Sequence, residues 1–305
     1  MENFRTGDTV TRKSYGNDIL FRIVAVDNSP DGKKKYILRG VLYRIIADAY
    51  EDDLQWQQPE VVRHEIEKSL LSVNSGHLIP EYEPDYDERE RKFDSLGKLL
   101  QEQYQNFRAF GGLSGLGEFI SYLLKHRGAP GKILQLDSSE DFLKMCFNFY
   151  KKSNLIYYGK VIPENEQPNH VVPLLKKTGA DILVITGHDA IKKNSFSYDN
   201  IKNYRNSAYF IQSVKNARKY EKDLDKLCIF AGACQSYYEG IMEAGANFAS
   251  SPGRILIHAL DPAKVADHVA LTDVKNFVTP EIIAKDTKSG LKGICGVKTR
   301  GHFRY

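Results

Sequence analysis

The sequence is poor in cysteine, and its cysteines lie far apart. Four occur in 305 residues, at positions 146, 228, 234 and 295, and no two of them form a CxxC pair. This usage excludes a disulfide-rich secreted scaffold, so we expect reduced thiols, one of which is free to act as a nucleophile. The His and Cys residues also lack metal-ligand spacing such as HExxH. We therefore expect neither a metal site nor a cofactor.

Long apolar runs and a strong charge of one sign are also absent. No run of about 18 apolar residues is present, and residues 1–5 lack the apolar core of a signal peptide. The net charge is only +4, and Lys and Arg are mixed with Asp and Glu along the chain. We therefore expect a cytoplasmic protein that neither inserts into a membrane nor binds nucleic acid.

The first part of the chain has the pattern of short strands joined by tight turns. Strand-like runs at 7–12, 19–26 and 36–42 are separated by turns rich in Gly, Asp and Asn. This pattern predicts a small SH3-like β-barrel over residues 1–58. Such a module either binds a partner or stabilises the domain that follows it.

A helical linker region is predicted over residues 59–130. Its Gly-rich stretch at 111–117 follows a predicted helix and has no Gly-Lys-Ser/Thr, which favours a linker over a phosphate-binding loop. The linker also contains basic residues that make it a candidate for self-cleavage. These are Arg89, Arg91 and Lys92.

Strand-like and helix-like segments alternate over residues 131–305. Short apolar runs at 132–137, 181–186 and 227–231 predict buried strands, with helical patterns between them. Further strands are predicted at 246–249 and 254–257. Such alternation is typical of an α/β domain with a mainly parallel sheet covered by helices on both faces.

Two of these strands end in small residues followed by a chemically reactive side chain. His188 follows the strand at 181–186, and Cys234 follows the strand at 227–231. Because the carboxyl ends of parallel strands carry the chemistry of such sheets, both side chains are expected on the same rim. Their separation of about 46 residues suits one crossover between neighbouring strands. The leading hypothesis is a nucleophilic site in which His188 activates the Cys234 thiol.

The residues around this pair supply the other parts of the expected site. A helix is predicted at 235–244, and its N-terminal N–H groups would stabilise a Cys234 thiolate and an oxyanion. Asp189 either orients His188 or caps the next segment. The candidate oxyanion donors are the backbone N–H groups at Gly187, Asp189 and Ala233.

The order of a strand followed by His and a strand followed by Ala-Cys resembles the caspase-like cysteine peptidases. In that group the His precedes the nucleophile by about fifty residues. The resemblance is incomplete, because Gly187 precedes His188 whereas those peptidases have Gly directly after the His. Gly232 also stands where they often have Gln or an acidic residue. The resemblance implies a caspase-like three-layer α/β domain with Cys234 as its nucleophile.

Segments 7–10, 14–18, 186–189, 231–236, 249–254 and 296–301 are distributed over nearly the whole chain. Together they resemble the YabG family of sporulation-specific proteases. This resemblance implies an endopeptidase that cleaves spore coat and cortex-associated proteins after basic residues. It also implies a location in the cytoplasm of the sporulating mother cell or in association with the spore coat.

A preference for basic residues would need an acidic pocket, and two carboxylates that follow later strand-like segments are candidates for it. These are Asp261 and Asp273.

Two other functions stay open. The Gly-x-Cys turn also resembles the nucleophile elbow of glutamine amidotransferases, in which His258 or His268 would be the partner of Cys234. Alternatively, the protein assembles the spore surface without catalysis, with the barrel as its docking module. Cys295, which also lies beside glycines, is a minor competitor for the role of nucleophile.

Overall fold

The computed structural model describes residues 4–28, 33–71, 129–192 and 197–304. Residues 72–128 of the predicted linker region, which include its Gly-rich stretch and the basic residues Arg89, Arg91 and Lys92, lie outside the described residues.

The N-terminal part contains a five-stranded antiparallel sheet in the order β4-β3-β2-β1-β5. Alternate residues of its strands, such as Tyr36 and Leu38 in one strand, point into a small core with Val10 and Phe21. The alternation that predicted β structure here therefore marks the buried face of this sheet. The elements are β1 (Thr9–Arg12), β2 (Phe21–Asn28), β3 (Lys34–Gly40), β4 (Ile46–Tyr50) and β5 (Leu54–Trp56), followed by helix α1 (Pro59–Leu71).

A six-stranded sheet organises the rest of the described chain, in the order β12-β10-β9-β8-β6-β7. Five neighbouring strands run parallel, and β12 is an antiparallel edge strand. The predicted α/β class with a mainly parallel sheet is therefore confirmed. The strands are β6 (Ile133–Asp137), β7 (Tyr157–Val161), β8 (Ile182–Ile185), β9 (Cys228–Ala231), β10 (Phe248–Ser250) and β12 (Ile294–Gly296).

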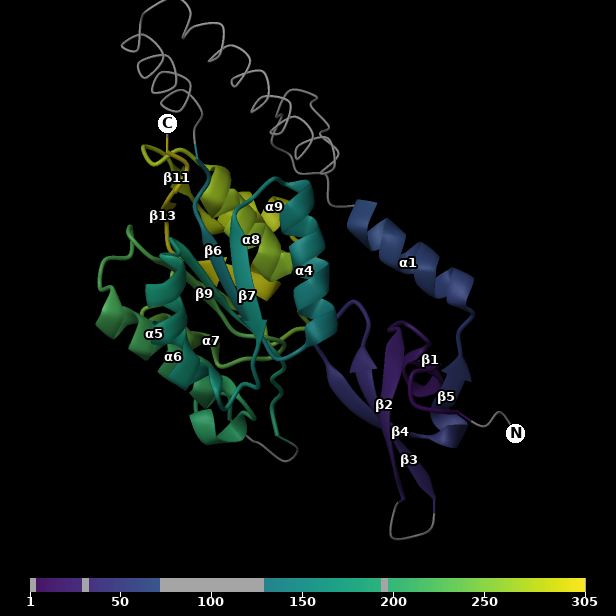
Figure 1. Cartoon of the computed structure of the whole chain (residues 1–305). Helices are drawn as coiled ribbons and strands as arrows, with labels where there is room; N and C mark the ends of the chain where they lie inside the picture. Colours follow the sequence, from purple (N-terminus) through teal and green to yellow (C-terminus); the bar gives the residue numbers. More distant parts are fainter. Residues whose placement is uncertain (1–3, 29–32, 72–128, 193–196, 305) are drawn as a thin grey trace, which may run out of the picture. The chain divides into compact units, whose positions relative to one another are not determined.

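Helices cover both faces of this sheet (Figure 1). In β8, Ile182 and Val184 belong to one buried cluster with α4, α8 and α9, while Leu183 and Ile185 belong to a second cluster with α5, α6 and α7. A strand that is apolar on both sides gives the continuous apolar runs seen in the sequence. These helices are α4 (Glu140–Lys152), α5 (Gln167–Thr178), α6 (Ser207–Tyr220), α7 (Tyr238–Glu243), α8 (Asp261–Leu271) and α9 (Pro280–Asp286).

Smaller elements complete the described chain. A two-stranded antiparallel pair joins residues near the C-terminus. The elements are η1 (Lys13–Tyr15), η2 (Glu51–Asp53), η3 (Ile201–Asn203), β11 (Phe277–Val278), α10 (Gly290–Gly293) and β13 (Thr299–Arg300).

The helix predicted at 235–244 begins later than expected. It starts at Tyr238, so Cys234 lies in the turn before it and does not open it. The cause is local: Gln235 has a φ of 55°, and the backbone N–H of Ala233 donates to the Ser236 hydroxyl. The prediction that a helix N-terminus stabilises the Cys234 thiolate is therefore wrong.

The strand predicted at 254–257 is also absent from the sheets of the described chain. Arg254 has a φ of 55°, which interrupts an extended backbone. The segment after it forms only an isolated antiparallel bridge, between His258 and Tyr43.

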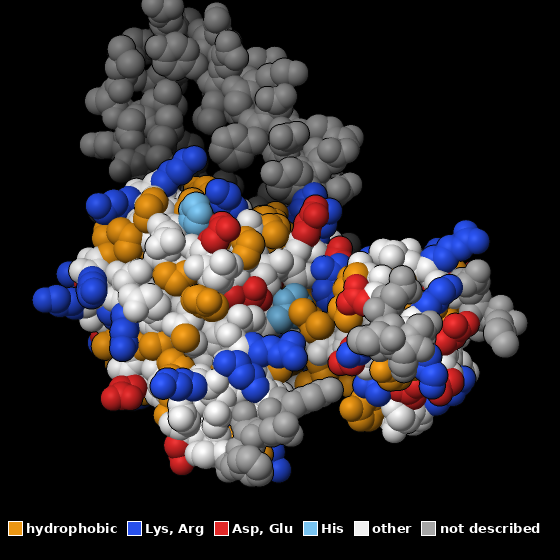
Figure 2. Space-filling view, turned by 90° about the horizontal axis from the view of Figure 1, so that it is seen from below, with side chains coloured by type: hydrophobic (Ala, Val, Ile, Leu, Met, Phe, Trp, Pro, Cys, Tyr) orange, Lys and Arg blue, Asp and Glu red, His pale blue; other side chains and the backbone are white. Residues whose placement is uncertain are grey.

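The surface carries charges of both signs. Figure 2 shows one face, on which Lys and Arg side chains form small separate groups among acidic, hydrophobic and other side chains. Among the described helices, none combines the length and the apolar character needed to span a bilayer.

The buried side chain of Asn247 joins the sheet to α6 through hydrogen bonds. Its Oδ1 accepts hydrogen bonds from the backbone N–H of Ile229 at 2.8 Å and from the Arg218 guanidinium at 2.6 Å. Only 1% of Asn247 is exposed, so water cannot replace these bonds. The start of β9 therefore depends on one side-chain amide.

We predict that Asn247→Ala lowers the free energy of unfolding by about 2–4 kcal/mol, because it removes the acceptor of the buried Ile229 N–H and of the half-buried Arg218 guanidinium. Urea unfolding of the variant beside the wild type measures this loss. Asn216→Ala is the control, since the Asn216 amide is half-buried and donates to a single carbonyl, that of Pro168. Equal stability of the two variants would contradict the prediction.

Candidate active site

The two residues expected on one rim follow adjacent strands. Ile185 at the end of β8 pairs with Ala231 at the end of β9, and the Thr186 hydroxyl donates to the carbonyl of Gly232 at 2.9 Å. His188 and Cys234 therefore leave neighbouring parallel strands at the same edge of the sheet, as predicted.

The imidazole of His188 is held from one side by a serine and a glutamate. Its Nδ1 lies 3.1 Å from the Ser138 hydroxyl oxygen and 3.6 Å from Oε1 of Glu164. Ser138 donates its own proton to Glu164 at 2.5 Å, so its oxygen accepts from a protonated Nδ1. This arrangement favours the tautomer whose Nε2 carries a free lone pair. Nε2 is buried and has no hydrogen-bond partner among the described residues.

Gly187 makes this arrangement sterically possible. A Cβ atom at this position would lie 2.5 Å from Oε1 of Glu164 and 2.7 Å from the Ser138 hydroxyl. The small residue between β8 and His188 thus lets Ser138 and Glu164 approach the backbone closely.

Glu164 is an ionised carboxylate in a mostly buried position. Burial alone would raise its pKa, but hydrogen bonds from His188 and Ser138 outweigh this effect and hold the pKa below the ordinary value of 4.5. One of these bonds comes from the backbone N–H of His188 at 2.7 Å. The sequence did not predict a role for Glu164, because this residue lies in the loop after β7, outside the two strand ends that carry His188 and Cys234.

Asp189 ties the loop of His188 to the loop of Cys234. Its carboxylate accepts hydrogen bonds from the backbone N–H of Asn206 at 2.8 Å and from the Ser236 hydroxyl at 3.0 Å, and it also accepts from the Ser207 hydroxyl. Burial raises its pKa despite these bonds. Of the two roles expected for Asp189, the contacts support anchoring of the following segment rather than orientation of the imidazole.

The thiol of Cys234 is enclosed by the protein. Only 1% of the residue is exposed, and the backbone N–H of Ile257 lies 3.1 Å from Sγ. Burial raises the pKa of the thiol to about 12, although the Ile257 N–H and the charge of Arg44 act in the opposite direction. In this closed arrangement Cys234 is a neutral thiol, and no described hydrogen bond joins it to His188.

Three backbone N–H groups near the pair have no acceptor among the described residues. The N–H groups of Cys234 and Asp189 donate to no acceptor in the part of the chain that the structure describes, whereas the N–H of Ala233 is engaged by Ser236. Of the three expected oxyanion donors, Ala233 is therefore committed elsewhere. The N–H of Gly187 also has no acceptor among the described residues.

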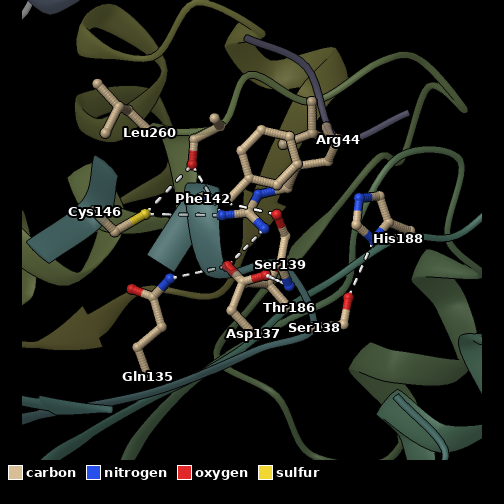
Figure 3. A network of polar contacts seen from close by, with 12 residues as sticks. Arg44, Gln135, Asp137, Ser138, Ser139, Phe142, Cys146, Thr186, His188 and Leu260 are labelled. Carbon is tan, nitrogen blue, oxygen red and sulfur yellow. Dashed lines mark hydrogen bonds and ion pairs between the residues drawn. The ribbon is translucent and has the colours of Figure 1, made fainter. Parts of the chain in front are cut away.

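An arginine from the loop between β3 and β4 lies beside this site (Figure 3). Arg44 is fully buried, and its Nη1 lies 2.8 Å from Oδ2 of Asp137. Its Nη2 donates to the carbonyl of Ala259 at 3.1 Å, and its guanidinium lies 4.8 Å from the centroid of the Phe142 ring. Although burial lowers the pKa of Arg44, the charge of Asp137 outweighs it and leaves the pKa above the ordinary value.

The other candidates from the sequence lie in different surroundings. Asp261 accepts from the backbone N–H groups of Lys288 and Ser289, and Asp273 accepts from that of Lys275. Neither carboxylate is bonded to Arg44. Both therefore have local structural contacts that account for them.

The described hydrogen bonds of the Cys234 sulfur go to the backbone of Ile257 and to neither histidine of the amidotransferase alternative. His268 is bonded to Asp286 at 2.7 Å, and His258 is so buried that its pKa is lowered to about 3. Cys295 is a half-buried free thiol in β12. The described residues contain no group of three or more His, Cys, Asp or Glu placed to hold a metal ion.

The buried contacts of Glu164 predict a pH-dependent contribution to stability. A carboxylate with a lowered folded pKa stabilises the fold above its unfolded pKa, and the contribution disappears as the pH falls through the folded value. We therefore expect Glu164→Gln to lower the free energy of unfolding by about 1–3 kcal/mol at pH 7. The difference should shrink as the pH falls below the ordinary value of 4.5.

Urea unfolding between pH 7 and pH 3 measures this difference. Glu140→Gln is the matched control, because Glu140 is an exposed carboxylate paired with Lys144 on α4. We expect this control to change stability little at any pH. A Glu164 effect that stays constant down to pH 3 would contradict the assignment.

Comparison with known proteins gives one match to a solved structure and one match to a protein over nearly the full length of the chain. A cobalamin-binding protein from Desulfitobacterium hafniense DCB-2 matches 68% of this chain and 91% of its own, at 13% identity and a TM-score of 0.29, which does not indicate a shared fold. In contrast, the sporulation-specific protease YabG of Bacillus subtilis (strain 168) is 36% identical over 302 residues, covering 99% of this chain and 97% of that protein. The model of the YabG peptidase U57 family matches residues 5–305. The chain therefore belongs to the YabG peptidase U57 family, a family of sporulation-specific proteases.

Proposed function

We propose that this protein is a cysteine endopeptidase in which Cys234 is the nucleophile and His188 the general base. The observation that carries the proposal is the position of both residues at the ends of two adjacent parallel strands, β8 and β9. Membership of a protease family supports peptide-bond hydrolysis as the reaction. The pair supplies the two groups that a cysteine peptidase needs.

The reaction follows from the tautomer of His188. Nε2 takes the proton of the Cys234 thiol, and the sulfur attacks the carbonyl carbon of the substrate. The protonated imidazole then gives its proton to the leaving amine as the C–N bond breaks. Water hydrolyses the resulting thioester and releases the new carboxylate. Glu164 and Ser138 stabilise the imidazolium through Nδ1 and are positioning residues.

The oxyanion that forms on the carbonyl oxygen needs hydrogen-bond donors. The N–H groups of Cys234 and Asp189 are the best placed by sequence and are without acceptors among the described residues. One such donor contributes about 100-fold or more to the rate of acyl transfer. In this scheme, the backbone contributes as much as the side chains.

The substrates we propose are proteins of the spore coat and cortex, cut after basic residues. The relative in Bacillus subtilis is a sporulation-specific protease, which supports the setting. A buried arginine side chain held by a carboxylate beside Cys234 supports the preference for a basic residue. We place the enzyme in the mother cell or on the spore coat, with a caspase-like catalytic domain and an SH3-like N-terminal module.

We predict that Cys234→Ala abolishes cleavage. Wild type, Cys234→Ala and Cys295→Ala are each incubated with a spore coat extract, and new peptide termini are identified by mass spectrometry. Wild type and Cys295→Ala should generate the same termini, each preceded by Arg or Lys, and Cys234→Ala should generate none. New termini that persist in Cys234→Ala would refute a Cys234 peptidase.

His188→Ala should lower kcat by about 10²–10⁴-fold, the usual contribution of a general base. Steady-state hydrolysis of a purified coat protein measures this loss, with His170→Ala, on α5, as the control. The amidotransferase alternative predicts the opposite pattern, in which His188→Ala is active and His268→Asn is inactive.

A further inference from the structure

The loop between β3 and β4, residues 41–45, leaves the N-terminal sheet. Its base is closed by a hydrogen bond from the Gly40 N–H to the carbonyl of Ile45 at 2.9 Å. A Cβ atom on Gly40 would overlap the carbonyl oxygen of Tyr43, so the loop depends on glycine at this position. The hairpin thus projects a short stretch of chain away from its own sheet.

This loop pairs with an extended segment next to Cys234. The carbonyl of Leu42 accepts from the N–H of Ala259 at 2.8 Å, and the N–H of Arg44 donates to the carbonyl of Ile257 at 3.1 Å. Tyr43 lies between them, in the isolated antiparallel bridge to His258. Alternate backbone bonds of this kind are how an extended peptide binds along an exposed strand edge.

The side chain of Arg44 fills a closed pocket whose floor is Asp137 (Figure 3). Asp137 is itself fixed, because its carboxylate also accepts from the backbone N–H of Ser139 at 3.0 Å and from the Gln135 amide at 3.3 Å. The ring of Phe142 forms one wall. A fixed carboxylate behind an aromatic wall is a binding site for a guanidinium group.

The pocket adjoins the proposed catalytic residues. Ile257 binds the Cys234 sulfur through its N–H and Arg44 through its carbonyl oxygen, so one residue contacts both. The His188 imidazole packs against the same Phe142 ring, with ring centroids 5.7 Å apart. Arg44 therefore occupies the position that a residue preceding a cut bond would take.

We propose that Asp137 recognises the basic side chain that precedes the cut bond in substrates, and that Arg44 occupies this pocket in the free chain as an internal substrate mimic that blocks the site. This assignment rests on the proposed peptidase function. It names the specificity residue of that site and makes the free chain less active than a chain from which Arg44 has left the pocket.

The alternative is that the Arg44–Asp137 ion pair only stabilises the fold, and this explains the contacts less well. A buried ion pair gives little net stability, because desolvation of both charges offsets their attraction. Arg44 also leaves its Nε buried and without a hydrogen-bond partner among the described residues. The bound loop also accounts for the enclosure of Cys234. A groove of about 1030 Å³ adjoins the bound loop at Ile45 and the nucleophile loop at Gln235.

The pocket can be tested without catalysis, in the Cys234→Ala protein. N-acetyl-arginine methylamide is the probe, and the uncharged N-acetyl-citrulline methylamide is its control. We expect the arginine probe to raise the Tm of Cys234→Ala/Arg44→Met in a dose-dependent way. It should not raise the Tm when Asp137→Leu is added, nor that of Cys234→Ala with Arg44 in place. An equal response with and without Asp137 would overturn the assignment.

Activity provides the second arm, with Cys234 intact. Arg44→Met should hydrolyse an acetyl-arginyl-aminomethylcoumarin substrate with a kcat/KM at least about tenfold above wild type, mainly through a lower KM, because the tethered competitor is gone. Arg44→Met/Asp137→Leu replaces the buried pair by apolar residues, which such sites tolerate, and should lose this gain. A double variant that folds and still prefers arginine would overturn the role of Asp137.

The two arms separate the two hypotheses. Probe binding that depends on Asp137, together with no hydrolysis by any variant, refutes the peptidase and retains the pocket. Hydrolysis that depends on Cys234 but not on Asp137 or Arg44 retains the peptidase and refutes the pocket.

Discussion

The parallel pairing of β6, β8 and β9 is the constraint on which the site depends. Parallel strands all end at one edge, so the last residues of three neighbours meet there. These ends supply Asp137, His188 and Cys234 in that spatial order. The proposed nucleophile, base and binding carboxylate thus meet without being close in the sequence.

Buried carboxylates then fix the geometry of this edge. Asp137, Glu164 and Asp189 are each largely removed from water, where an unpaired charge would be very costly. Each is surrounded by donors, and each joins segments distant in the sequence. Asp189 links the His188 loop to the Cys234 loop, and Glu164 links the loop after β7 to His188. The rigidity that the proposed catalytic pair needs comes from these hydrogen-bonded carboxylates rather than from the side chains of His188 and Cys234.

The strand ends could be predicted from the sequence because they depend on local pattern. Apolar runs such as 182–185 and 228–231 can be identified without knowledge of their tertiary contacts. The position of His188 and Cys234 at the same edge of the sheet follows from these runs. Asp137 also stands at the end of an apolar run, since it is the last residue of β6. An aspartate at the end of a strand is common in turns, however, so its position alone does not predict a role in the site.

The other parts of the site depend on tertiary contacts, which the periodicity of the sequence does not predict. Arg44 reaches the site from the β3–β4 loop, and Glu164 reaches it from the loop after β7. The turn at Cys234 also escaped prediction, because serine hydroxyls take the N–H groups of Ala233 and Gln235 that a helix start would leave free. A sequence with helical spacing therefore begins its helix one turn late.

If Arg44 occupies the Asp137 pocket as proposed, the same pocket determines substrate specificity and limits the activity of the free chain. A loop tethered to its own chain has a high effective concentration, so an external peptide with the same contacts competes poorly against it. The same closed state raises the pKa of Cys234 by burial, which keeps the sulfur in its unreactive neutral form. Removal of the loop would expose the carboxylate and hydrate the thiol together. In this proposal one movement would provide both the binding pocket and the nucleophile, so that a single arginine in the β3–β4 loop would control a site built from three strand ends.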